Sequence, residues 1–129
     1  MPDIKVNIKF IPAFAEIVDG KMTAVNAMAR ITCLDFDTAN RFVIEIDNRL
    51  KRYDILRCLA HELAHAKQFA YGELSYKYNH AERRSIAVYR NVEYDDYDVD
   101  TDEYWFLPWE IEAYGYEHSL MRVYNKRKR

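Results

Sequence analysis

The sequence predicts an α+β fold in which a small antiparallel sheet packs on one long helix and a second helix ends the chain. Two observations support this prediction. The first half of the 129-residue chain alternates apolar and polar side chains with the period of two that is typical of strands, whereas the second half has apolar side chains at intervals of three and four, the period of a helix. We expect one domain over residues 1–129, because this length is too short for two ordinary domains.

The strands are expected before residue 50. Between residues 4 and 10, isoleucine, valine and phenylalanine alternate with lysine and asparagine, and Pro12 ends this strand. Asp19-Gly20 is a turn signal. A longer extended stretch follows over residues 25–36. A short hairpin loop then leads into Arg41–Asp47, whose apolar side chains again fall on one face.

Two helices are expected after residue 50. The better-defined one covers Asp54–Tyr71, with Asp54 as its N-cap and Gly72 as its C-terminal stop. The second covers Pro108–Lys126, because proline suits a first helical turn, acidic residues follow it, and the end of the segment is basic. Between them, residues 85–92 fit a short helix or a strand equally well.

The sequence His61-Glu62-Leu63-Ala64-His65 lies in the middle of the first helix. Residues four apart on a helix project from the same face, so His61 and His65 can bind one zinc ion together. Glu62 is rotated by about 100° from His61, where it can reach a water molecule on the metal and act as a general base. The small residues around the histidines leave room for an ion. This stretch is therefore expected to be a metal-binding helix.

A catalytic zinc ion needs a third protein ligand and an open coordination position. We expect the third ligand to be Glu112 on the second helix, where Ala113 beside it leaves space. Glu110 stands nearer the start of that helix and is better suited to stabilising its N-terminus. Glu110, His80, His118 and an aspartate of the acidic segment remain further candidates for this ligand.

These motifs resemble the zincin metallopeptidases, and within them the gluzincins. The resemblance rests on residues 61–68, on Gly72-Glu73-Leu74 and on residues 108–113, about a quarter of the chain. The combination also looks like small, poorly characterised zincin-like proteins encoded by bacteriophages. The fold implied is a minimal zincin-like domain.

The resemblance implies that His61, His65 and Glu112 bind Zn²⁺ and that Glu62 is the general base of a peptide-bond hydrolase. Gluzincins often carry an aspartate four residues after the ligand glutamate, and Tyr116 stands at that position here. The expected partner is a peptide or protein substrate. Arg41–Asp47 could hold it as an exposed sheet edge, or it could be an ordinary strand.

Three further features bear on function and location. The acidic, tyrosine-rich segment 93–106 fits a mobile loop, or the contact surface of a non-catalytic zinc-binding or interaction module. Lys126–Arg129 is a short basic tail, and a net charge of −2 gives no reason to expect nucleic-acid binding. No apolar run approaches a membrane helix and no signal-peptide core begins the chain, so a cytoplasmic location is expected, that of the host if the protein is viral. The oligomeric state is left open.

Overall fold

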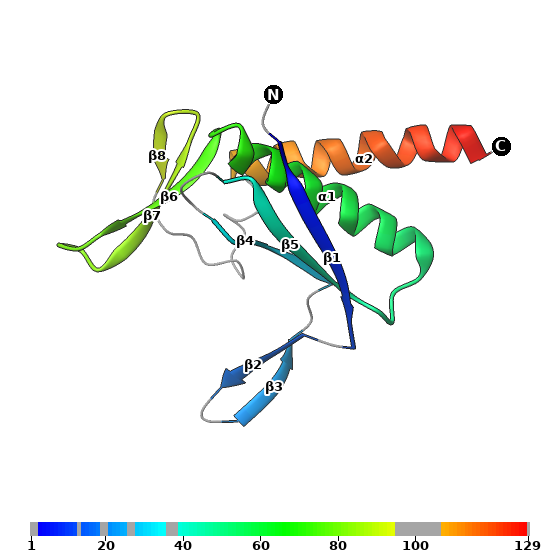
Figure 1. The fold of residues 1–129 in the computed structure, drawn as a ribbon, viewed down its shortest axis with the longest axis horizontal. Coiled ribbons are helices and arrows are strands. Elements are labelled where there is room, and N and C mark those ends of the chain that lie inside the picture. The colour runs from blue at the N-terminus through cyan, green and yellow to red at the C-terminus, as the bar shows by residue number, and fades with distance from the viewer. Residues whose placement is uncertain are drawn as a thin grey trace.

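Two helices and eight strands make up the described part of the chain, which covers residues 3–12, 14–18, 21–25, 28–35, 39–94 and 107–128 of a computed structural model (Figure 1). The strands form three small sheets, and the two helices lie side by side. The predicted α+β class is confirmed. Neither helix in the described ranges combines the length and the apolar character needed to cross a bilayer.

The first sheet differs from the prediction in one respect. β1 (Lys5–Ile11), β4 (Ala29–Cys33) and β5 (Arg41–Asp47) form it in the order β1-β5-β4. β4 and β5 are antiparallel, but β1 and β5 are parallel, so this sheet is mixed. The chain between β1 and β5 runs through β2 (Phe14–Val18), β3 (Lys21–Val25) and β4 and returns in the same direction, which makes the parallel pair. Arg41–Asp47 is the central strand, so its backbone is paired on both sides and cannot be the substrate-binding edge.

One face of β5 fixes the position of the helix that carries His61 and His65. Phe42, Ile44 and Ile46 are at most 1% exposed. Phe42 packs against the ring of Phe69 on the helix, with 6.3 Å between the ring centroids, and against Ala66 in the same cluster. Alternation along the strand thus turns a continuous apolar row toward the helix, as the period-two pattern predicted.

This helix, α1, covers Arg52–Ala70 and begins two residues before the predicted Asp54. The prediction that Asp54 is the N-cap is wrong, because Lys51 occupies that position without a side-chain hydrogen bond. Asp54 lies in the first turn, where its carboxylate pairs with Arg57 at 3.5 Å. Gly72 ends the helix as predicted: its φ of +70° is the left-handed conformation that glycine adopts without strain.

A two-stranded hairpin and a three-stranded sheet flank this core. β2 (Phe14–Val18) and β3 (Lys21–Val25) pair around the predicted turn Asp19-Gly20, which itself lies outside the described residues. β6 (Leu74–Asn79), β7 (Arg84–Tyr89) and β8 (Val92–Tyr94) form a third sheet. The ambiguous segment 85–92 is therefore extended, with a turn at Arg90 and Asn91, which both have positive φ.

The second helix, α2, covers Pro108–Lys128 and packs along α1 (Figure 1). Its first residues lie near the end of α1, where Gln68 donates a hydrogen bond to the carbonyl of Trp109 at 2.9 Å. Trp109 also anchors α2 to the third sheet through Tyr89 and Tyr94. This antiparallel arrangement brings the first turn of α2 over the histidines of α1.

Candidate metal centre

The α1 helix places both histidines of the sequence motif on the face that meets α2. His61 and His65 are each only 8% exposed, and the small side chains of Ala60 and Ala64 are buried beside them. The two Nε2 atoms lie 3.2 Å apart. The spacing of four residues therefore places both histidines on one face of the helix, as predicted, and both imidazoles present the same nitrogen to one point.

Glu110 completes this group from the first turn of α2. One of its carboxylate oxygens lies 3.1 Å from Nε2 of His61 and 3.3 Å from Nε2 of His65, and the other lies 2.9 Å from Nε2 of His65. Glu110 is 4% exposed. In the described part of the chain, His61, His65 and Glu110 form the one group whose atoms are close enough to share a metal ion.

Glu112 does not reach the histidines, so the choice of Glu112 as the third ligand is corrected to Glu110. Two residues advance about 200° around a helix, and only one of the two glutamates can face them. The carboxylate of Glu112 accepts hydrogen bonds from Gln68 at 3.0 Å and from the Tyr89 hydroxyl at 3.1 Å. Arg90 pairs with it as well.

His80, His118 and Glu93 of the acidic segment also lie away from this group. His80 packs against Tyr78 beyond β6, with 4.9 Å between ring centroids. His118 is exposed and lines a groove farther along α2. Glu93 pairs with Lys77, while residues 95–106 of the acidic segment lie outside the described residues.

The far nitrogen of each imidazole has its own partner. Nδ1 of His61 lies 3.1 Å from a carboxylate oxygen of Glu117, and Nδ1 of His65 lies 2.8 Å from the side-chain oxygen of Gln68. A carboxylate can only accept, so the Glu117 contact requires the proton of His61 on Nδ1. Metal-binding histidines commonly donate their second N–H in this way, which orients the ring.

The side-chain amide of Gln68 fixes the tautomer of His65 by the same reasoning. Gln68 is fully buried, and its NH₂ group lies between the carbonyl oxygen of Trp109 and the carboxylate of Glu112. Both neighbours are acceptors, so the amide nitrogen must face them and the amide oxygen must face His65. That oxygen then accepts the Nδ1 proton of His65.

With both protons on Nδ1, the two Nε2 atoms carry lone pairs that point at each other and at Glu110. Three acceptors thus meet in a buried space with no hydrogen between them, which is unfavourable unless a cation lies there. Two atoms that each bind tetrahedral zinc at about 2.0–2.1 Å are roughly 3.3 Å apart. The separations of 3.1, 3.2 and 3.3 Å among the two Nε2 atoms and one carboxylate oxygen of Glu110 fit that geometry.

A proton can take the place of the metal ion in the metal-free protein. Burial lowers the pKa of His65, but the hydrogen bond to Glu110 and the charge of that carboxylate outweigh it and bring the pKa above its usual 6.5. The metal-free site therefore holds a proton between His65 and Glu110 more readily than a free imidazole would. A metal ion must displace that proton, so binding is coupled to pH.

Glu62 lies on α1 between the histidines and is half-buried. Its burial raises the pKa of the carboxyl group, while the nearby histidines lower it and the charges of Glu110 and Glu117 add to the rise. A carboxylate with a raised pKa is a stronger base than one in water, which suits a group that accepts and returns a proton.

Sequence reasoning missed the residues that surround the histidines. Glu117 and Gln68 hold the imidazoles, and Tyr114 packs on the ring of His61 with 4.4 Å between centroids. One signal was present: Glu110 and Glu117 are seven residues apart, which places two carboxylates on the same face of a helix. The position four residues after the ligand glutamate is Tyr114 once Glu110 takes that role.

Comparisons with known proteins identified no relative of this chain. No protein-family model matches the chain, and neither a curated protein nor a solved structure matches it.

Proposed function

We propose that this protein is a zinc-dependent metallopeptidase. The observation that carries the proposal is the convergence of Nε2 of His61, Nε2 of His65 and the carboxylate of Glu110, while Nδ1 of each imidazole faces an oxygen atom of Glu117 or Gln68. A buried group of two imidazoles and one carboxylate suits Zn²⁺. Three protein ligands leave one coordination position for water or substrate, as in catalytic zinc sites.

The chain's own groups then have distinct roles. His61, His65 and Glu110 would hold a zinc ion, which would supply a Lewis acid for the substrate carbonyl and for the acidity of water. Glu62 accepts a proton from the attacking water and returns it to the leaving amine. Glu117 and Gln68 keep the two imidazoles in the orientation and tautomer that bind the ion.

A peptidase also has to hold an extended peptide. Within the described residues, β4 is an edge strand that contacts α1, whereas β5 is paired on both sides. An added peptide strand along β4 would gain main-chain hydrogen bonds from that edge. We therefore transfer the substrate-binding role from Arg41–Asp47 to β4.

The decisive experiment separates metal binding from catalysis. Protein purified without added metal is analysed by mass spectrometry for zinc, and a peptide mixture is incubated with the zinc-loaded protein and searched for new ends. We expect about one zinc ion per chain and cleavage that Glu62→Gln abolishes while the zinc remains. Zinc that stays bound without any hydrolysis would identify a non-catalytic zinc-binding module instead.

A further inference from the structure

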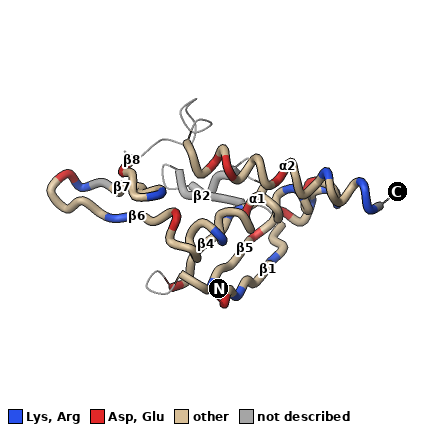
Figure 2. The backbone as a smooth tube through the Cα atoms, turned by 90° about the horizontal axis from the view of Figure 1, so that it is seen from above, with Lys and Arg blue, Asp and Glu red and all other residues tan. Residues whose placement is uncertain are grey.

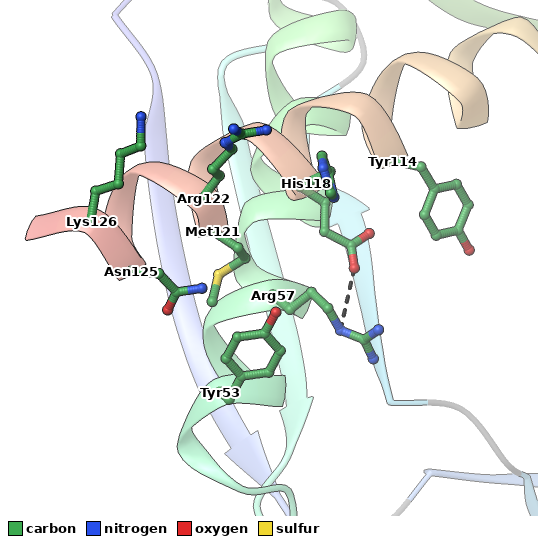
Figure 3. Close-up of a pocket in the computed structure, with 9 residues that line it drawn as sticks. Tyr53, Arg57, Tyr114, His118, Met121, Arg122, Asn125 and Lys126 are labelled. Carbon is green, nitrogen blue, oxygen red and sulfur yellow. Dashed lines mark ion pairs between the residues drawn. The ribbon is translucent and has the colours of Figure 1, made fainter. Parts of the chain in front are cut away.

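A groove of about 710 Å³ lies beside the metal centre, between the first half of α1 and the second half of α2 (Figure 3). Tyr53 and Arg57 line it from α1, and a continuous stripe of α2 residues from Tyr114 to Lys126 lines it from the other side. Met121, which is 5% exposed, gives it an apolar base. The groove is therefore wide enough for a side chain and has an apolar base.

The groove is positively charged. Along α2, acidic positions lie toward the first turns and basic positions gather toward the C-terminal end (Figure 2). Arg57, Arg122 and Lys126 line the groove, and Glu117 is the one acidic side chain among its lining residues (Figure 3). The carboxylate of Glu117 is already shared between His61 and Arg57, with 3.3 Å to the Arg57 Nε atom.

The two cations on α2 are available to an anionic ligand. Among the described residues, no ion pair involves Arg122 or Lys126. Both side chains are exposed, so a ligand in the groove can reach them from solvent.

Two contacts connect the groove to the metal centre and to the sheet edge. Tyr114 and Glu117 line the groove and also contact His61, so the groove begins at the outer side of a metal-binding imidazole. Arg57 reaches Met28 immediately before β4, with 3.9 Å between its guanidinium and the sulfur atom. A peptide extended along β4 would pass the mouth of this groove.

We propose that the groove is a specificity subsite that receives an acidic side chain, aspartate or glutamate, of a peptide substrate. A carboxylate matches the positive charge of Arg122 and Lys126, and the short apolar stem of the same side chain fits against Met121 and Tyr53. The peptide nature of the ligand rests on the proposed peptidase function, whereas the preference for an anion rests on the groove itself.

Direct binding tests this without requiring catalysis. The zinc-loaded Glu62→Gln protein is titrated into a short fluorescent peptide with two adjacent glutamates and into its counterpart with glutamines. We expect the glutamate peptide to bind about tenfold more tightly, and rising salt to remove the difference. Arg122→Ala combined with Lys126→Ala should abolish this preference. A matched control, Arg52→Ala with Arg127→Ala, removes the same charge from exposed positions outside the groove and should keep it.

Three other outcomes of the peptide titration would overturn the proposal. Equal binding of the two peptides, no binding of either, or a preference that survives in the Arg122/Lys126 variant would show that the groove does not select acidic peptides. A single-stranded oligonucleotide that binds more tightly than the glutamate peptide, and loses this binding in the same variant, would assign the groove to nucleic acid instead.

Failure of the subsite proposal and failure of the peptidase proposal give different experimental results. If the wild-type protein cleaves both peptides with equal KM, the peptidase stands and the subsite falls. If the glutamate peptide binds selectively but the wild-type protein cleaves neither, the subsite stands as a binding site and the hydrolase falls. Zinc content measured in the Arg122/Lys126 variant should equal that of the wild type, because neither residue belongs to the metal-binding group.

Discussion

Glu110 and Glu112 lie two residues apart on α2, yet their carboxylates have opposite surroundings. Glu110 faces the lone pairs of two imidazoles, which are acceptors in the metal-binding tautomers. Glu112 faces donors: the Gln68 amide, the Tyr89 hydroxyl and the Arg90 guanidinium. A cation beside Glu110 would be favoured by the imidazole lone pairs around it, whereas Glu112 is surrounded by donors.

The difference shows that the neighbours of a carboxylate decide its role more than its place in a motif. A glutamate with three donors gains little from a metal ion, because the ion would have to replace bonds that already satisfy it. A glutamate that faces other acceptors gains much more from a nearby metal ion, because the ion relieves the contact between unpaired acceptors. Substitutions in these two surroundings should therefore differ in effect.

The largest expected effect compares the two glutamates directly. Glu110→Gln replaces a charged ligand atom with a neutral one, and zinc affinity should fall by more than about 100-fold, since loss of a mere orienting partner already costs up to that much. Glu112→Gln keeps an oxygen that can accept from Gln68, and affinity should change by less than about tenfold. Competition with a fluorescent zinc chelator measures both. A larger loss in Glu112→Gln than in Glu110→Gln would restore Glu112 as the ligand.

Glu117 tests whether the partner of the far nitrogen contributes to the site. Glu117→Ala should weaken zinc binding by about 10- to 100-fold, because His61 loses the carboxylate that orients its ring. Asp54→Ala is the matched control: Asp54 also pairs with Arg57 but lies outside the metal-binding group. The same chelator competition applies, and equal effects of the two substitutions would mean that Glu117 acts only through general electrostatics.

Gln68 contacts both His65 and Glu112, so it links the surroundings of Glu110 to those of Glu112. Gln68→Leu leaves the Nδ1 proton of His65 and the carbonyl of Trp109 without this partner in the core. The free energy of unfolding of the zinc-free protein should fall by about 1–2 kcal/mol. Urea denaturation followed by circular dichroism measures it, and an unchanged midpoint would contradict the network.

The smallest expected effect is on the pH dependence of stability in the zinc-free protein. His65 and Glu112 contribute to it in opposite directions. The pKa of folded His65 is raised, so its stabilising contribution is complete below pH 6.5 and is lost as the pH rises through the folded value. Burial alone would raise the pKa of Glu112, but the Gln68 and Tyr89 hydrogen bonds and two nearby cations bring it below its usual 4.5. Its contribution is present above pH 4.5 and is lost as the pH falls through the lowered value.

Melting temperatures measured from pH 3 to pH 9 can separate the two contributions. His65→Gln should flatten the curve above pH 6.5, and Glu112→Gln should flatten it below pH 4.5. If His65→Gln instead changed only the acidic limb, the proton shared by His65 and Glu110 would be excluded.

Local patterns in the sequence predicted the parts of the molecule that depend on local geometry. Alternation along residues 4–10 and 41–47 predicted β1 and β5, and helical spacing predicted α1 with its paired histidines. Gly72 predicted the end of α1 because glycine adopts the left-handed conformation found there. The parallel pairing of β1 with β5 could not be predicted, since it depends on how the intervening chain returns.

The choice between the two glutamates depended on how α2 is rotated about its axis, and its apolar residues do not settle that rotation, because they occur on both its buried and its exposed sides. Helices ordinarily bury an apolar stripe. Here Ile111 is 55% exposed and Leu120 is 48% exposed, whereas Glu110 is 4% exposed and Glu117 is 9% exposed. The helix buries its carboxylates because they contact the histidines. The same side of the helix also buries Trp109, Ala113 and Met121, so the two carboxylates interrupt a buried apolar stripe that hydrophobicity alone does not reveal.

The fixed orientation of the Gln68 amide makes a remote hairpin part of the metal chemistry. A half-turn of that amide would offer its NH₂ group to His65, so Nδ1 would have to accept and Nε2 would carry the proton, which turns a ligand into a group that repels cations. Glu112 opposes this flip, and Glu112 is held in turn by Tyr89 and Arg90 at the end of β7. Substitutions in β7 should therefore tune metal affinity at a distance, although no residue of that strand belongs to the metal-binding group.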